Sequence, residues 1–361
     1  MVRIAVVGLG KMGISHLSII RAHPDVDLVA VCDTAGYMLD GLAKYTGLKT
    51  YTDFDKLLSE VQLDGIILAT PSAAHMSMAK AALAKGIAVF CEKPFTLSPS
   101  DSQELTDLAK ANNVTNQVGY HYRFVGTFQE VKRLLDQGAI GNVSHVLAEA
   151  YGPVVLKAKG TTWRTQSKSG GGCLYDYAAH PINLLNWYFG EPIAVGGTQL
   201  NKIFSGNTDD EVYSTLFFDD GPSVQLSVNW SDDSHRKMTT RLTFWGTNGR
   251  IFVDRQEVQV YLREPHPDLP AYGKGWTARY ITELTDNVWF YLRGEEYSAQ
   301  LDHFVRATAN HSVGENSFES AAVTDRVIAM LIADDEAGPT LAANAMPSQV
   351  PKAKRRGFFK I

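Results

Sequence analysis

Residues 3–13 read RIAVVGLGKMG, and this stretch decides the fold of the first part of the chain. Its apolar run predicts a short buried strand, and a helical pattern follows from about Met12. Gly8, Gly10 and Gly13 have the GxGxxG spacing that permits a tight turn, close approach of a pyrophosphate and close packing of helix on strand. The pattern predicts a dinucleotide site. The alternative is an ordinary glycine-rich turn between a strand and a helix.

Asp33 favours the dinucleotide interpretation. It ends the second predicted strand, LVAVCD, and lies 20 residues after Gly13. A carboxylate at this point accepts hydrogen bonds from both hydroxyls of an adenosine ribose, and its charge repels a 2′-phosphate. Thr34, the next residue, is not the arginine that would bind such a phosphate. We therefore expect NAD as the cofactor rather than NADP.

The order of apolar runs predicts two domains. Short runs alternate with helical patterns over the first 120 residues, which predicts a doubly wound parallel sheet covered on both faces. From Ile193 to Arg263 the chain reads as consecutive strands separated by turns such as DDG and GTNG, which predicts a mostly antiparallel sheet. We expect an α/β domain over residues 1–121 and a sheet-rich α+β domain over residues 122–361, whose C-terminal helix could pack back on the first.

The composition excludes several classes of protein. With 45% hydrophobic residues, 20% charged residues and a net charge of −5, the 361-residue chain carries no overall signal for nucleic acid or a membrane surface. Cys32, Cys91 and Cys173 form no CxxC or Cys/His cluster, so no disulfide framework or zinc site is indicated. Because the chain opens directly on a strand pattern, we expect a cytoplasmic protein without a signal peptide.

Residues 91–95, CEKPF, place an acid and a base at the end of an apolar strand. Ligands bind at the carboxyl ends of the strands in a doubly wound sheet, so Glu92 and Lys93 are expected to face the cofactor crevice. Pro94 restricts the backbone of Lys93. The alternative is an exposed Glu–Lys pair at a strand end.

Four motifs occur in order: GLGKMG, ATPSAAH, CEKPF and GGGCLYDYAAH. With them the chain, to about Gly338, resembles the Gfo/Idh/MocA family of oxidoreductases, which includes glucose–fructose oxidoreductase and inositol dehydrogenases. The resemblance implies an N-terminal Rossmann domain, a C-terminal domain with an open-faced sheet, and hydride transfer between nicotinamide and a carbon of a sugar, polyol or related compound. It implies no metal, because a Lys/His pair suffices for this chemistry.

The resemblance also implies catalytic roles. Lys93 matches the lysine that holds the reacting hydroxyl and makes it more acidic, and His180 matches the acid/base position. Asp176 matches the partner of that histidine, and its i, i+4 spacing from His180 places both on one face of a predicted helix around residues 174–188. Asn183 stands where several family members carry an aspartate that bonds a substrate hydroxyl. A structural role for His180, and a helix-surface role for Asn183, are the alternatives.

The full set of expected contacts is wider. The resemblance implies cofactor contacts at Gly8, Leu9, Gly10, Lys11, Met12, Gly13, Asp33, Thr34, Thr70, Pro71, His75, Glu92, Lys93, Arg123, Trp163 and Arg164, and substrate contacts at Lys93, Tyr122, Asp176, His180 and Asn183. Three of the cofactor contacts have a weaker basis. His75 could instead cap local backbone, Trp163 could instead belong to the core, and the proline that often follows the Arg-Phe segment in the family is missing after Arg123.

The sequence leaves the substrate open among a sugar, an inositol, a sugar acid and a nucleotide sugar. The loop with Lys157, Lys159, Arg164 and Lys168 either contacts an anionic group of the substrate or is solvated. The basic stretch PKAKRRGFFK has these two alternatives and a third, a contact with another subunit. An exposed sheet face favours a homodimer or homotetramer. Two other functions stay open: a redox-neutral enzyme with tightly bound NAD, as in the NAD-dependent glycosidases, and a non-catalytic NAD-binding regulator.

Overall fold

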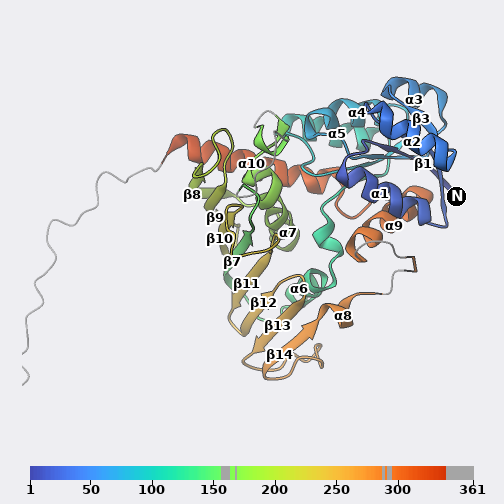
Figure 1. The fold of residues 1–361 in the computed structure, drawn as a ribbon. Helices are drawn as coiled ribbons and strands as arrows, with labels where there is room; N and C mark the ends of the chain where they lie inside the picture. Colours follow the sequence, from blue (N-terminus) through green and yellow to red (C-terminus); the bar gives the residue numbers. More distant parts are fainter. Residues whose placement is uncertain (156–162, 167–168, 287–288, 291–294, 339–361) are drawn as a thin grey trace, which may run out of the picture.

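The computed structural model describes residues 1–155, 163–166, 169–286, 289–290 and 295–338, and Figure 1 shows its ribbon. Six parallel strands form the first sheet in the order β3-β2-β1-β4-β5-β6, which confirms the predicted doubly wound sheet. The three-residue strands β3 and β6 were not predicted, because they are too short to carry a pattern. The strands are β1 (Val2–Val7), β2 (Val26–Cys32), β3 (Lys49–Tyr51), β4 (Gly65–Leu68), β5 (Ala88–Cys91) and β6 (Asn116–Val118).

Helices cover both faces of this sheet. The helices pack on the sheet through apolar residues that recur at helical spacing. In α1 the buried face includes Leu17, Ile19 and Ile20. The helices that follow the strands are α1 (Lys11–Ala22), α2 (Gly36–Thr46), α3 (Phe54–Glu60), α4 (His75–Leu83) with the short η1 (Ser72–Ala74) before it, and α5 (Pro99–Ala111).

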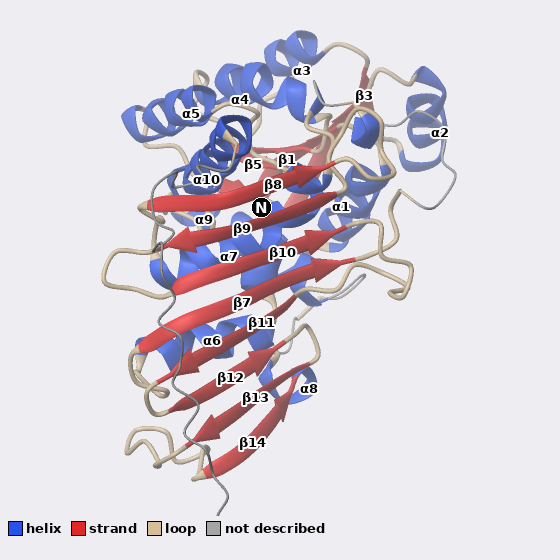
Figure 2. Cartoon of the chain, turned by 90° about the vertical axis from the view of Figure 1, so that its left-hand side faces the viewer, coloured by secondary structure: helices blue, strands red, loops and turns tan. Residues whose placement is uncertain are grey.

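The second sheet has eight strands in the order β14-β13-β12-β11-β7-β10-β9-β8. Only the β7–β10 pair among its described neighbours is parallel, so the sheet is mostly antiparallel, as expected. Figure 2 shows helices behind one face and the other face uncovered. The strands are β7 (Val143–Tyr151), β8 (Ala194–Asn201), β9 (Glu211–Phe217), β10 (Ser223–Asn229), β11 (Arg241–Gly246), β12 (Gly249–Val253), β13 (Glu257–Leu262) and β14 (Gly275–Tyr280).

Two of the remaining helices, α9 and α10, connect the two parts of the chain. α9 packs against α1 and β1, and α10 packs against α5, α7 and β8, so the C-terminal part of the chain contacts both sheets. Phe95, after β5, lies against Phe318 of α10 with ring centroids 4.3 Å apart. The remaining helices are η2 (His121–Phe124), α6 (Gly126–Asp136), η3 (Trp163–Thr165), the π-helical η5 (Leu174–Ala178), α7 (Ala179–Phe189), α8 (Ile281–Leu284), α9 (Glu295–Asn310) and α10 (Phe318–Ala337).

Strand register brings the ends of β1, β4 and β5 to one edge of the first sheet. Val7 is opposite Leu68, and Leu68 is opposite Cys91. The glycine loop, the ATP segment and the CEKP segment, which follow these strands, therefore lie side by side.

Candidate active site

The glycine loop joins β1 to α1 at this edge. Gly8 has φ of +88°, and a Cβ there would lie 2.6 Å from the carbonyl oxygen of Ala69, so the position requires glycine. A Cβ on Gly13 would lie 1.8 Å from the carbonyl oxygen of Gly8, which shows how closely α1 approaches β1. A Cβ on Gly10, in contrast, would meet none of the described atoms within 4 Å. The space beside Gly10 is therefore open to a ligand.

The first turn of α1 faces the same space. Gly10 is its N-cap and has no side chain to bond the first N–H groups of the helix. Free N–H groups and the helix dipole favour an anion at this point. Leu9 is buried, Met12 is half-buried and Lys11 is exposed, so the charged residue of the loop lies at its outer side.

Asp33, after β2, is fixed beside the glycine loop. Its Oδ1 accepts a hydrogen bond from the backbone N–H of Ala35 at 2.7 Å, and its Oδ2 accepts one from the N–H of Leu9. Each oxygen keeps a lone pair for a further donor. Thr34 is exposed next to it. The arrangement fits a pair of hydroxyls such as those of a ribose.

The residues after β4 differ in their environment. Oγ1 of Thr70 is buried and lacks a hydrogen-bond partner among the described residues, so it can serve a ligand in the crevice, while Pro71 is exposed. His75 is fully buried: Nδ1 faces the carbonyl oxygens of Pro94 and Phe95 at 3.0 and 3.1 Å, and Nε2 faces that of Thr70 at 3.0 Å. Burial lowers the pKa of His75, against the effect of these carbonyls. The ring connects the segments after β4 and β5, which is the backbone-capping alternative.

Lys93, after β5, forms the centre of a charged site. Its Nζ donates hydrogen bonds to Oδ1 of Asp176 at 2.8 Å and to the backbone oxygen of Asp176 at 2.9 Å. Nε of Arg164 donates to Oδ2 of the same carboxylate at 2.7 Å. Burial acts to raise the pKa of Asp176, but the charges of Lys93 and Arg164 outweigh it, so the pKa is lowered. Asp176 is therefore an anion held between two cations.

The sequence predicted one regular helix around residues 174–188. The structure differs in the turn that carries Asp176. Residues Leu174–Ala178 form a π-helical turn, and α7 begins only at Ala179. A π-turn closes its hydrogen bonds over one more residue than an α-turn, and such turns are frequent at functional sites. Both carboxylate oxygens of Asp176 bond the two cations rather than His180.

His180 has a buried, aromatic environment. Its ring centroid lies 4.9 Å from that of Tyr122 and 5.1 Å from that of His121. Its Nδ1 is buried and has no hydrogen-bond partner in the described part of the chain. Burial lowers the pKa of His180 well below 6.5, and the charge of Lys93 adds to this effect. The imidazole is therefore neutral at neutral pH and able to accept a proton.

His16, on the buried face of α1, is a residue that the sequence patterns did not single out. Its Nε2 lies 2.6 Å from Oε1 of Glu92, and Oε2 of Glu92 accepts a hydrogen bond from the backbone N–H of Lys93 at 3.1 Å. Burial acts to raise the pKa of Glu92, but His16 and the charge of Lys93 lower it overall. Glu92 thus connects α1 to Lys93. The position of His16, three residues after Gly13 on the same helix, was the available signal.

A second group missed in the sequence lies beside His180. His121 stacks on Tyr297 with centroids 4.6 Å apart and an interplanar angle of 19°. Arg255, from the turn between β12 and β13, pairs with Glu296 and lies over the Tyr122 ring at 5.7 Å. Because these residues come from separate segments of the chain, no local pattern joins them.

Arg123 of η2 and Asn183 of α7 contact each other. Arg123 Nε donates to Oδ1 of Asn183 at 3.0 Å, and Nδ2 of Asn183 donates to Oγ1 of Thr324 at 3.2 Å. Both residues are buried, so these bonds tie η2, α7 and α10 together. The hydroxyl of Tyr122 likewise accepts a hydrogen bond from Oγ1 of Thr240 at 3.1 Å. Arg123 and Asn183 thus have structural bonds, and their contacts with cofactor and substrate stay predictions.

Part of the predicted site falls outside what the structure describes. Trp163 belongs to η3, and the structure describes the backbone of this residue but not its side chain. Lys157, Lys159 and Lys168, and the basic stretch near the C-terminus, lie outside the described residues.

Comparisons with known proteins agree with this geometry. Residues 2–120 match an oxidoreductase family with an NAD-binding Rossmann fold, and residues 128–252 match the GFO/IDH/MocA C-terminal domain. A curated relative, scyllo-inositol 2-dehydrogenase (NAD(+)) of Bacillus subtilis (strain 168), is 27% identical over 316 residues, which are 86% of each chain.

Two solved structures share the fold. Levoglucosan dehydrogenase in complex with NADH has a TM-score of 0.84 at 20% identity and covers 94% of this chain and 98% of its own. The WlbA dehydrogenase from Bordetella pertussis, in complex with NADH and UDP-GlcNAcA, has a TM-score of 0.82 at 21% identity and covers 93% of this chain and 96% of its own.

The glycine loop, Asp33 and the Lys93 site on a doubly wound sheet define a nicotinamide-dependent oxidoreductase. The chain belongs to the oxidoreductase family with the NAD-binding Rossmann fold and the GFO/IDH/MocA C-terminal domain. The expected family, fold class and cofactor, NAD, are thereby confirmed.

Proposed function

We propose that the protein moves a hydride between NAD and a hydroxyl-bearing carbon of a sugar, inositol, sugar acid or nucleotide sugar. The observation that carries the proposal is the Lys93–Asp176 ion pair of 2.8 Å, which lies at the strand ends beside the glycine loop. The names of an inositol dehydrogenase, a levoglucosan dehydrogenase and a dehydrogenase bound to UDP-GlcNAcA support this substrate class.

The residues present fit NAD. The open space beside Gly10 and the uncapped start of α1 would hold the pyrophosphate, Asp33 would hold the ribose hydroxyls, and Oγ1 of Thr70 would supply one further hydrogen bond. The nicotinamide, when bound, accepts or returns the hydride.

Lys93 would position and activate the reacting hydroxyl. An ammonium group has three donors, and Lys93 uses them on two oxygens of Asp176, so one stays available for the hydroxyl oxygen of a substrate. Its charge stabilises the negative charge that develops on this oxygen as the proton leaves. Asp176 stays ionised and holds Lys93 in place.

His180 would take the proton. A neutral imidazole can accept the hydroxyl proton, and the lowered pKa keeps it neutral. Lys93 and Asp176 are paired with each other as a cation and an anion, so His180 is the neutral group left to accept the proton.

The test is the near-ultraviolet absorbance of NADH. The purified protein is mixed with NAD or NADP and pooled inositols, aldoses, sugar acids and nucleotide sugars, with Lys93→Met as the control variant. A rise with one pool and NAD, absent in the variant, supports the proposal. No rise with any pool, together with nucleotide that is released only on denaturation, would favour the redox-neutral enzyme or the regulator instead.

We also propose that a second copy of the chain covers the open face of the eight-stranded sheet. On this face Trp276 is 59% and Tyr280 is 51% exposed. Exposed aromatic side chains on a sheet favour association. Light scattering after size exclusion should give the mass of a dimer or tetramer, and a monomer at micromolar concentration would contradict the proposal.

We also propose that the protein is located in the cytoplasm. The three cysteines are buried and free, as in a reducing compartment. Within the described residues, no helix is long and apolar enough to cross a membrane. Fractionation of the source cells tests this location.

A further inference from the structure

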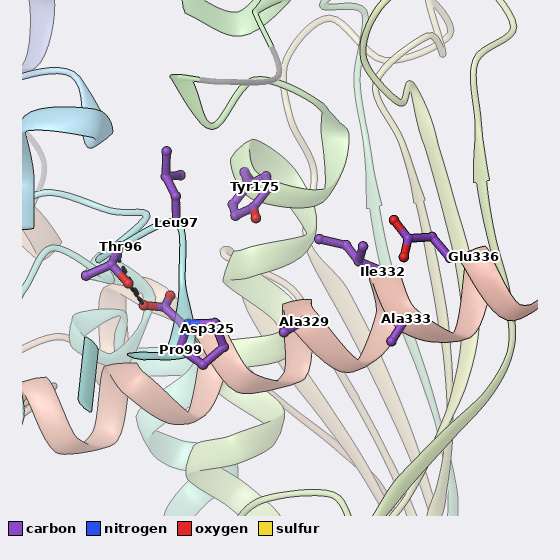
Figure 3. Close-up of a pocket in the computed structure, with 9 residues that line it drawn as sticks. All are labelled: Thr96, Leu97, Pro99, Tyr175, Asp325, Ala329, Ile332, Ala333 and Glu336. Atoms are coloured by element: carbon purple, nitrogen blue, oxygen red, sulfur yellow. Dashed lines mark hydrogen bonds between the residues drawn. The ribbon is translucent and has the colours of Figure 1, made fainter. Parts of the chain in front are cut away.

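A cavity of about 250 Å³ lies between α10, the segment before α5 and the π-helical turn (Figure 3). Leu97, Pro99, Ala329, Ile332 and Ala333 form its apolar wall. Lys93, Asp176 and His180 are not among the residues that line it. The cavity is therefore separate from the candidate active site.

Asp325 of α10 brings a buried carboxyl group to this cavity. The residue is 4% exposed, and its Oδ2 accepts hydrogen bonds from the backbone N–H of Thr96 at 3.1 Å and from its hydroxyl at 2.9 Å. Oδ1 has no hydrogen-bond partner among the described residues. Figure 3 shows this second oxygen on the side of Leu97, away from the bond to Thr96. A buried carboxylate oxygen without a well-directed donor is unfavourable, so Oδ1 can accept a further hydrogen bond.

The charges around the cavity have one sign. Asp325 and Glu336 line it, and the described lining residues include no basic side chain. Arg326, next in the chain, donates through Nε and Nη2 to Glu191 at 2.7 and 2.6 Å, so its guanidinium is engaged elsewhere. Burial raises the pKa of Asp325 to about 7 and outweighs the hydrogen bonds from Thr96 and Ser102 and the charge of Arg326, which act to lower it. A cationic donor at Oδ1 would therefore stabilise the ionised form of Asp325.

Tyr175 suits the same kind of ligand. Its half-buried ring lines the cavity next to Ile332, and an aromatic face attracts a cation as well as an apolar group. A compound with an ammonium head and a compact apolar body would match Asp325 at one end and the apolar wall at the other.

We propose that this cavity is a binding site for a small organic ammonium compound. Its N–H group bonds Oδ1 of Asp325, and its apolar part lies against Ile332 and Tyr175. Thr96 follows Lys93 by three residues and Tyr175 precedes Asp176, so the compound contacts both segments that hold the Lys93–Asp176 pair. The proposal does not depend on the identity of the substrate.

Titration calorimetry with benzylammonium on the full-length protein tests the proposal, with benzyl alcohol as the neutral match. We expect benzylammonium to bind about tenfold or more tightly than the alcohol, because a charge-assisted hydrogen bond is replaced by a neutral one. No binding of benzylammonium, or equal binding of the two probes, would overturn the proposal.

Variants locate the site. Asp325→Asn keeps an oxygen for Thr96 but presents an amide to the ligand, and should weaken benzylammonium by about tenfold or more. Glu336→Gln, at the exposed rim, should weaken it less. Ala329→Leu fills the cavity and should abolish binding while Asp325 remains. If Asp325→Asn fails to fold, the Ala329→Leu result decides, and undiminished binding in that variant places the probe elsewhere.

Discussion

Gly10→Ala tests whether the space beside the glycine loop belongs to the cofactor. Gly10 has φ of −64° and ψ of −175°, which any residue adopts, and a Cβ there meets none of the described atoms within 4 Å. The free protein should therefore keep its stability or gain up to about 1 kcal/mol from the stiffer unfolded chain. In the NADH complex the methyl group would occupy the path of the pyrophosphate. We expect the Kd for NADH to rise about tenfold or more, which corresponds to about 1.4 kcal/mol.

Two other glycines are matched controls for this substitution. Gly41, in α2, also has open space for a Cβ, so Gly41→Ala should raise the stability by about 0.5–1 kcal/mol and leave NADH affinity unchanged. A Cβ on Gly13 would lie 1.8 Å from a backbone oxygen, so Gly13→Ala should lower stability by about 1–3 kcal/mol. Thermal unfolding and NADH fluorescence titration measure both quantities. Wild-type affinity in Gly10→Ala, or a loss of stability like that of Gly13→Ala, would refute the reasoning.

Other predictions concern the charged site and the ribose site. Lys93→Met should lower kcat about 100-fold or more, while NADH still binds; unchanged turnover would remove Lys93 from catalysis. Asp33→Ala should narrow the ratio of kcat/KM for NAD over NADP, and an unaltered ratio would place the ribose elsewhere. His16→Ala removes the partner of Glu92 and should lower kcat about tenfold with little change in KM, with partial recovery in His16→Gln; a loss of stability alone would show a purely structural role. His180 acts unprotonated and its pKa is lowered, so the acid limb of kcat/KM against pH should lie below pH 6.5, and a limb above that value would contradict its role as the base.

Local patterns were sufficient for the parts of the site that follow a single strand. The turn at Gly8 and the carboxylate of Asp33 depend on short stretches whose conformation neighbouring residues decide. The position of Lys93 at the end of β5 followed from strand polarity alone. These features could be predicted because a doubly wound parallel sheet places the carboxyl ends of all its strands at the same edge.

The features that escaped prediction depend on contacts between distant segments. The bond between Arg123 and Asn183 joins residues 60 apart, and the pairing of Lys93 with Asp176 joins residues 83 apart. The π-turn at residues 174–178 inserts one residue into a pattern that otherwise reads as an α-helix, so periodicity cannot reveal it. Strand β14 was not predicted either. Its residues alternate between half-buried and exposed and none is fully buried, so the strand lacks the apolar alternation that marks a half-buried strand.

One arrangement of charge accounts for both roles at the centre of the site. The Lys93 ammonium next to a developing alkoxide lowers the free energy of that anion, and the same ammonium raises the free energy of a protonated His180. A carboxylate alone beside the histidine would do the opposite and hold the imidazole protonated. Asp176 does not have that effect, because both its oxygens are bonded to Lys93 and Arg164 and the group of three carries net positive charge. The pairing of Asp176 with two cations therefore keeps His180 a base and the substrate hydroxyl acidic at the same pH.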